Sequence, residues 1–168
     1  YLEMYPVGEP KKIIAALDPI LITDTKGKIF FHNPYALRFL DLPEDQMEIG
    51  IGIHGEPGRV RMPLKSADEI VEMLMEPIIS DIPYKPGDEL LMFVNGMGGT
   101  PLIELYILYR KAHEIASKHG LKVVRNLVGP YITSLEMAGT SITLLKLDDD
   151  MKQLWDAPVK TPALRWGV

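Results

Sequence analysis

The stretch MEIGIGIHGEPG, residues 47–58, places a histidine at the end of a run in which apolar and small residues alternate. The ordinary pKa of histidine is about 6.5, so a neutral imidazole is available near pH 7 as a nucleophile or a base. We interpret His54 as a reachable side chain at the carboxyl end of a strand, where open α/β sheets commonly bind ligands. The alternative is a surface or hydrogen-bonded histidine at a turn, because one histidine by itself specifies no reaction.

The residues before His54 indicate how it would be positioned. Apolar side chains stand at every second position from 47 to 53, and successive side chains of a strand point to opposite faces. The pattern predicts a strand over residues 47–53 with one apolar face, while Gly50 and Gly52 leave the other face bare. Glycine inside a strand often marks the close approach of a ligand or another backbone. We expect His54 to share the bare face with both glycines and to be exposed to solvent.

Two further motifs have a chemical and a structural interpretation. The glycine-rich stretch NGMGGTP, residues 95–101, could bind an anion through its backbone N–H groups. It lacks the lysine of a P-loop, so we favour a tight turn where a helix and a sheet pack closely. Asp148, Asp149 and Asp150 could suggest a metal, but consecutive side chains diverge and a helix N-terminus favours acids. We interpret them as a helix cap and expect this chain to bind neither a metal nor a cofactor.

The remaining elements follow from periodicity and from capping signals. Strands are expected at residues 19–24, 28–33, 89–96, 121–129 and 141–147, and the first two read as a hairpin. Helices are expected after the Asn33 cap, behind a capping box at Ser66 and Glu69, from Thr100 to Gly120, around residues 131–137 and over residues 148–159. Pro77 should limit the second of these helices, and residues 56–65 should form a loop.

The order of these elements predicts an α/β fold. Strands and helices alternate in the second half, which favours helices packed on a mixed or largely parallel sheet. The strands at 89–96 and 121–129 flank the longest helix, as in a crossover unit.

Composition excludes several classes of protein. The chain has 168 residues, enough for one ordinary domain, and 46% of them are hydrophobic. Its net charge of −5 argues against a nucleic-acid surface, and the absence of cysteine excludes disulfides and thiol catalysis. No apolar run approaches the roughly 20 residues of a membrane span. The first residues show neither a signal peptide nor an initiator Met, so we expect a cytoplasmic protein that is a fragment or a processed form.

Four long motifs carry a family resemblance. MEIGIGIHGEPG, NGMGGTP, VGPYITSLEMAGTSITLLKLDDD and LWDAPVKTPALRWG together resemble the second half of the substrate-binding subunit of dihydroxyacetone kinases. The resemblance covers residues from about 43 to 168. It implies a two-layer α/β domain on a mixed sheet of about six strands, with helices packed on one face.

The resemblance also implies a function. His54 matches the histidine that binds the ketone of dihydroxyacetone, also called glycerone, covalently as a hemiaminal, with Gly52 and Gly55 against the substrate. A hydroxyl is then phosphorylated in glycerol metabolism. The donor is held by another domain or subunit, with ATP and magnesium there or a phosphotransferase relay. The family's first domain, which carries its acid/base groups, is not matched by this chain, so we expect the chain alone to be inactive.

Residues from about 11 to 42 do not look like that family. They resemble the opening of a PAS sensor domain, with two strands, a glycine turn and a helix that starts at Asn33. We expect domains at residues 1–43 and 44–168, with the PAS-like hairpin joined to the sheet of the second. The alternatives to a kinase subunit are a PAS-like sensory or dimerisation module and a recombined or engineered chimera without catalytic activity. A homo-oligomer is left open.

Overall fold

The computed structural model describes residues 21–23, 29–32, 45–51, 58–134 and 138–167. The chain divides into two compact units, residues 1–65 and 66–168. The boundary expected between residues 43 and 44 stays a prediction, and so does the joining of the first hairpin to the main sheet. The helix expected after Asn33 lies outside the described residues.

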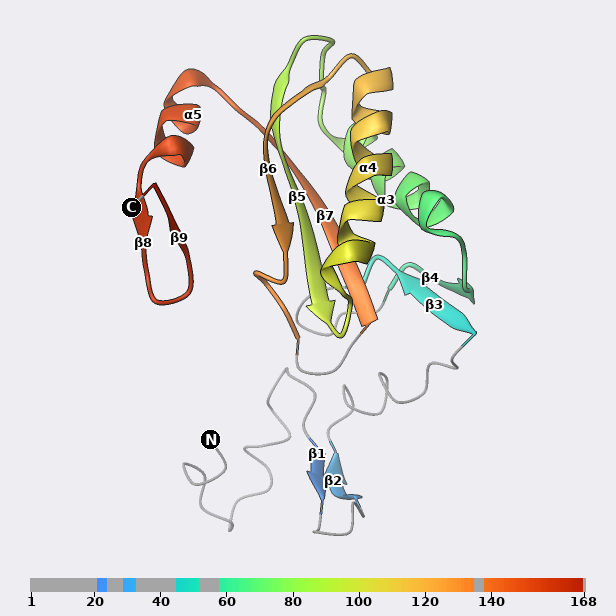
Figure 1. The fold of residues 1–168 in the computed structure, drawn as a ribbon. Coiled ribbons are helices and arrows are strands. Elements are labelled where there is room, and N and C mark those ends of the chain that lie inside the picture. Colours follow the sequence, from blue (N-terminus) through green and yellow to red (C-terminus); the bar gives the residue numbers. More distant parts are fainter. Residues whose placement is uncertain (1–20, 24–28, 33–44, 52–57, 135–137, 168) are drawn as a thin grey trace. The chain divides into compact units, whose positions relative to one another are not determined.

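The first unit contains two antiparallel strand pairs (Figure 1). β1 (Leu21–Thr23) pairs with β2 (Ile29–His32), which confirms the predicted hairpin. β3 (Gln46–Ile49) pairs with β4 (Val60–Pro63), and Met47 faces Met62 in their register. The expectation of a loop over residues 56–65 was therefore wrong at β4. Val60 and Met62 alternate with Arg61, but the run is only four residues long and ends at Pro63, so the pairing with β3 decides that it is a strand.

A three-stranded mixed sheet forms the centre of the second unit. β5 (Glu89–Gly98) lies in the middle, parallel to β6 (Lys122–Gly129) and antiparallel to β7 (Ala138–Lys146). The prediction of an α/β fold with a mixed sheet is thus confirmed. Within the described residues this sheet has three strands rather than about six, and the other strands form two-stranded pairs.

Two helices pack on this sheet and enclose the core (Figure 1). α3 (Ala67–Asp81) contacts α4 (Leu102–Lys118) and β7, while α4 contacts β5 and β6. The fully buried hydrophobic side chains come from α3, β5 and α4: Val71, Met75, Leu90, Met92, Val94, Leu105, Ala112 and Ala116. Burying such side chains removes apolar surface from water and contributes the main favourable term of folding. α4 is the predicted crossover between the parallel strands β5 and β6.

The apolar side chains of α4, the helix expected from Thr100 to Gly120, are only partly buried. Leu105, Ala112 and Ala116 face the core, whereas Leu102 and Tyr106 are exposed, together with Ile103 and Ile107.

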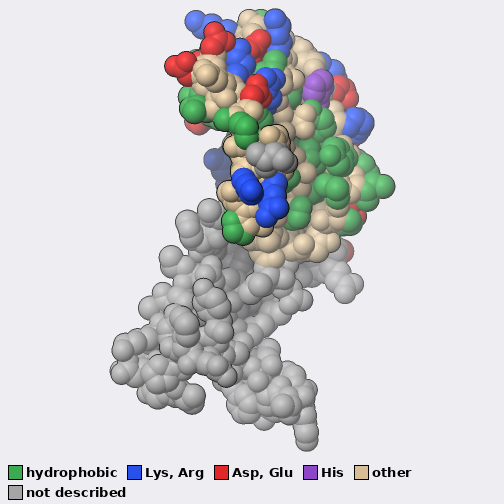
Figure 2. Space-filling model, turned by 60° about the vertical axis from the view of Figure 1, so that its left-hand side comes forward, with side chains coloured by type: hydrophobic (Ala, Val, Ile, Leu, Met, Phe, Trp, Pro, Cys, Tyr) green, Lys and Arg blue, Asp and Glu red, His purple; other side chains and the backbone are tan. Residues whose placement is uncertain are grey.

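On the face shown in Figure 2, acidic and basic side chains intermingle around hydrophobic ones. Among the residues placed by the structure, none of the helices has the length and apolar character needed to cross a bilayer.

The boundaries of two helices differ from the sequence expectations, and a third expected helix is missing from the described residues. α3 continues through Pro77 to Asp81, because Ile78 and Ile79 pack against the core and hold the last turn. α4 begins after Pro101 without a side-chain cap, since the Thr100 hydroxyl donates to the Gly139 carbonyl 2.8 Å away. The helix expected around residues 131–137 is absent over 131–134, the part that is described.

The chain ends in a short helix and a strand pair. α5 (Asp149–Asp156) begins at Asp148, whose carboxylate accepts the backbone N–H of Met151, so the predicted cap is confirmed. β8 (Val159–Lys160) pairs with β9 (Arg165–Trp166). The rings of Trp155 and Trp166 lie 5.1 Å apart between their centroids, which ties this pair to α5.

Candidate functional site

The candidate site begins with a segment whose centre the structure does not describe. His54, Gly52 and Gly55, the predicted catalytic and substrate-binding residues, all lie outside the described residues. Their predicted roles stay predictions. The residues on both sides, up to Ile51 and from Gly58, are described and show how the segment is attached.

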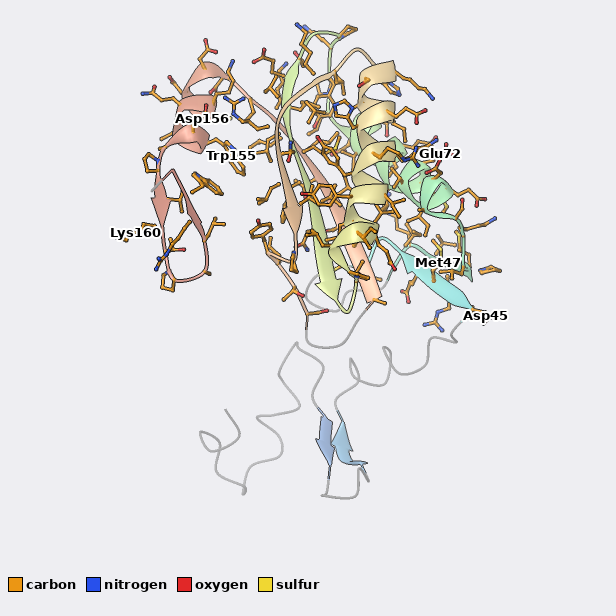
Figure 3. The ribbon with its side chains drawn as sticks, viewed as in Figure 1. Asp45, Met47, Glu72, Trp155, Asp156 and Lys160 are labelled. Atoms are coloured by element: carbon orange, nitrogen blue, oxygen red, sulfur yellow. The ribbon has the colours of Figure 1, made fainter. Side chains whose placement is uncertain are left out.

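The β3–β4 hairpin holds the two ends of this segment together. The chain leaves β3 after Ile49 and returns at Arg59, whose backbone N–H donates to the Ile49 carbonyl at 2.7 Å. At the other end of the hairpin, the N–H of Leu64 donates to the carbonyl of Asp45 at 2.8 Å. Figure 3 shows Asp45 and Met47 on this hairpin, and Met47 is buried. Residues 50–58 are therefore a connection between two paired strands.

Gly50 ends the regular strand earlier than its sequence suggests. Its φ of 76° lies in the left-handed region, which glycine adopts without steric cost. The predicted strand over residues 47–53 therefore stops at Ile49. The expectation that His54 shares a face with Gly50 and Gly52 stays a prediction, because His54 and Gly52 lie outside the described residues.

Glu48 connects β3 to the returning chain. Its Oε1 accepts the backbone N–H of Gly58 at 2.7 Å, and its Oε2 lies 3.5 Å from Nη2 of Arg61. Its side chain is 14% exposed, against 41% for Arg61. Hydrogen bonds to a charged acceptor are stronger than those between neutral groups. The carboxylate therefore ties together three positions of the hairpin.

The NGMGGTP stretch packs closely against α4, as we favoured, but its first four residues continue strand β5 to Gly98 and do not form the expected turn. A Cβ built on Gly96 would lie 2.8 Å from Cδ1 of Leu105, a fully buried side chain of α4. Any larger residue would force the buried Leu105 side chain, or the helix that carries it, to shift. Gly98 has a φ of 64°, and its N–H donates to Oγ1 of Thr133 at 3.0 Å. This N–H is thus already bound within the protein.

Asn95 is the polar residue that sequence reasoning missed. It is only 2% exposed, and its side chain bonds both backbone groups of Ile132. Nδ2 donates to the Ile132 carbonyl at 2.7 Å, and the Ile132 N–H donates to Oδ1 at 2.8 Å. These bonds occupy groups that a helix would need, which explains the missing helix at 131–134. The signal available in the sequence was a polar asparagine near the end of an otherwise apolar expected strand.

Several charged side chains of the second unit form ion pairs. Arg125 binds Asp156 through two nitrogens, at 2.7 and 2.5 Å, and this contact lowers the pKa of Asp156. Hydrogen bonds to Asp149 and Glu89 raise the pKa of Lys152 to about 12. No cluster of His, Cys, Asp or Glu suited to a metal ion occurs in the part of the chain that the structure describes. These carboxylates serve the fold.

Comparison with known proteins decides the family. The Dak1 domain model matches residues 31–163. The chain belongs to the Dak1 domain family. The match includes the His54 segment and begins inside the segment that resembles a PAS domain. The PAS-like interpretation of residues 11–42 is not confirmed by the comparisons and remains a prediction.

Two Dak1 relatives and one solved structure illustrate the similarity. The PEP-dependent dihydroxyacetone kinase, dihydroxyacetone-binding subunit DhaK, of Escherichia coli is 41% identical over 150 residues, covering 75% of this chain and 42% of that protein. The L-erythrulose kinase of Pectobacterium atrosepticum is 38% identical over 130 residues, and the match covers 75% of this chain and 22% of that kinase. The dihydroxyacetone kinase operon co-activator DhaQ superposes with a TM-score of 0.67 at 29% identity, covering 85% of this chain and 42% of that one.

This chain spans about two fifths or less of the length of these relatives. What their names say of substrates and activity is therefore a statement about the longer proteins.

Proposed function

We propose that this chain is part of a dihydroxyacetone-binding subunit in which His54 attaches the ketose covalently. The observation that carries the proposal is the Dak1 match, which runs through the histidine segment. The relatives include a dihydroxyacetone-binding subunit and a kinase of another small ketose. The β3–β4 hairpin adds support, because it attaches both ends of the segment to a paired scaffold.

The proposed reaction is an addition. A ring nitrogen of neutral His54 forms a bond to the carbonyl carbon of the ketose, and the π bond of the carbonyl breaks. The proton that the imidazole loses is delivered to the former carbonyl oxygen, which becomes a hydroxyl, so no atom leaves. Such an addition requires a carbonyl, and it therefore separates a ketose from glycerol. Attachment fixes the substrate, which is how a covalent intermediate or anchor assists a later step.

Phosphorylation requires groups beyond these residues in our proposal. The donor is ATP with magnesium, or a phosphotransferase relay, held by another domain or subunit, and the family's first domain supplies the acid/base groups. Phosphoryl transfer depends on positioning and charge stabilisation of the donor. The described residues support no role of their own in holding it.

The decisive experiment is a titration with dihydroxyacetone labelled with ¹³C at the carbonyl. We expect the carbonyl resonance to be replaced by that of a tetrahedral carbon bound to the protein. His54→Ala should abolish the new resonance, and His113→Ala, which removes an exposed histidine of α4, should leave it unchanged. A tetrahedral resonance that survives in His54→Ala would refute the attachment site.

A second candidate is a regulatory domain that binds the ketose without phosphorylating it. The similarity to the operon co-activator favours this candidate, since that protein is described as a regulator. A PAS-like sensory segment at residues 11–42 would suit such a role. Both candidates predict ketose capture, and they differ in turnover. A phosphorylation assay of the full protein with the donor subunit supplied separates them.

A further inference from the structure

We infer that Glu48 is a positioning residue for His54, and that it acts through the backbone of Gly58, where the chain returns towards β4. The inference deepens the proposed function and rests on it. Glu48 lies on β3, before the segment, and Gly58 is the first described residue after it. The contact between them therefore spans His54 in sequence.

The geometry at Gly58 is specific to Glu48. A Cβ built there would lie 2.5 Å from Cγ, 2.6 Å from Oε1 and 2.9 Å from Cδ of Glu48. Real Cβ atoms do not approach other atoms so closely. No positive φ is recorded for Gly58, so its backbone is open to any residue and the requirement for glycine is purely steric. The carboxylate and the bare backbone at position 58 thus fit each other.

The bonding at Glu48 explains why a carboxylate suits this place. One oxygen accepts the Gly58 N–H at 2.7 Å, and the other faces Arg61 at 3.5 Å. Arg61 is also the direct neighbour of Glu48 in the strand register. The guanidinium balances a charge that is largely withdrawn from water, and burying a charge is costly unless it is paired.

The two ends of the segment are set in different ways. On the β3 side, Gly50 turns the chain with a φ of 76°, a property of its backbone. On the β4 side, Gly58 is held by the Glu48 side chain. Losing the carboxylate should therefore leave the turn at Gly50 intact and release the return of the chain at Gly58. A loosely held nucleophile has a lower effective concentration at its substrate.

The test compares ketose capture and local protection in matched variants. In Glu48→Ala we expect the affinity for ¹³C-labelled dihydroxyacetone to fall about ten- to a hundredfold, the loss typical of a charged hydrogen bond. Glu48→Gln keeps an oxygen that accepts the Gly58 N–H and should retain most of the affinity. Glu72→Ala removes an exposed carboxylate that pairs with Lys111 on the helices, and it should have no effect.

A double-mutant cycle isolates the contact. Gly58→Ala should reduce capture as strongly as Glu48→Ala, and adding it to Glu48→Ala should cost little more, because the clash disappears with the side chain. Amide hydrogen exchange at Gly58, measured without ligand, should accelerate in Glu48→Ala and stay slow in Glu48→Gln. Unchanged thermal unfolding midpoints would separate positioning from a loss of fold.

The outcomes distinguish this inference from the proposed function. If the native chain captures the ketose and Glu48→Ala captures it equally well, the positioning role is wrong and the function stands. Equal loss in Glu48→Gln and Glu48→Ala would also refute the role, because the acceptor oxygen is retained in the first. If the native chain captures no ketose, the proposed function fails and the role falls with it.

Discussion

At the scale of single residues, Asn95 controls the conformation of a loop that lies far from it in sequence. The Asn95 side chain takes the place of backbone partners for Ile132, and the Thr140 hydroxyl donates to the backbone carbonyl of Asn95 at 2.9 Å. Buried polar groups are tolerated when such bonds are complete. Asn95 thereby joins the carboxyl end of β5 to the chain that leaves β6.

We predict that Asn95→Ala destabilises the protein by about 1–3 kcal/mol, because it leaves both backbone groups of Ile132 without their partner. Chemical denaturation measures this change. Asn126→Ala, at an exposed position of β6, is the matched control and should cost less. Equal losses in the two variants would contradict the special role of Asn95.

At the scale of elements, α3 and α4 begin in different ways. Ser66 and Glu69 form a complete capping box, in which Oγ of Ser66 accepts the Glu69 N–H at 3.4 Å and Glu69 accepts the Ser66 N–H at 3.1 Å. α4 has Pro101 at its cap position and no side-chain cap. Its position follows instead from packing against β5 and β6.

We predict that Ser66→Ala lowers the free energy of unfolding by about 1 kcal/mol, the usual cost of losing an N-cap hydroxyl. Ser80→Ala removes an exposed hydroxyl within α3 that donates to the Pro77 carbonyl, and it should cost less. Urea denaturation of both variants provides the comparison. A larger loss of unfolding free energy in Ser80→Ala than in Ser66→Ala would show that the N-cap is not a main contribution to the stability of α3.

The ion pair between α5 and β6 predicts a pH dependence of stability. Arg125 lowers the pKa of Asp156 in the folded state, so the pair stabilises the protein above the unfolded pKa of about 4. This contribution is lost as the pH falls through the lower folded value. Asp149 and Asp88 show the same direction, through Lys152 and Lys146.

We therefore expect the thermal unfolding midpoint to fall on acidification below about pH 4, and to fall less steeply in Asp156→Asn. Asp150→Asn, which changes an exposed carboxylate in the first turn of α5, should retain the native slope. A slope in Asp156→Asn equal to that of the native chain would remove the pair as a cause.

At the scale of the whole molecule, the chain carries a Dak1 domain match over residues 31–163, which is most of its length. The glycine stretch at residues 95–101 has no P-loop lysine. In the structure, Gly96 packs against Leu105 and the Gly98 N–H is bonded to Thr133. These backbone positions are used by the fold.

We predict that calorimetric titration with ATP and magnesium gives no micromolar binding constant, and that the chain alone does not phosphorylate dihydroxyacetone. Binding of the ketose in the same preparation, followed by ¹³C resonance, is the positive control. Micromolar binding of ATP, or turnover that is lost in His54→Ala, would show that the machinery is complete in this chain.

The sequence by itself determined the features whose causes lie within a few residues. The capping box at Ser66, the cap at Asp148 and the hairpin of β1 and β2 depend on local hydrogen bonds and turn residues. The α/β class and the crossover from β5 through α4 to β6 follow from periodicity and order. The motifs around His54 indicated the family that the domain match then established.

The tertiary structure decided the features whose partners lie far apart in sequence. β4 becomes a strand because β3 pairs with it, and α3 passes Pro77 because the residues beyond it are buried. The segment at 131–134 follows Asn95, and the return of the chain at Gly58 follows Glu48. Local preferences amount to about 1 kcal/mol or less per residue, so burial and completed hydrogen bonds override them where the fold brings the groups together.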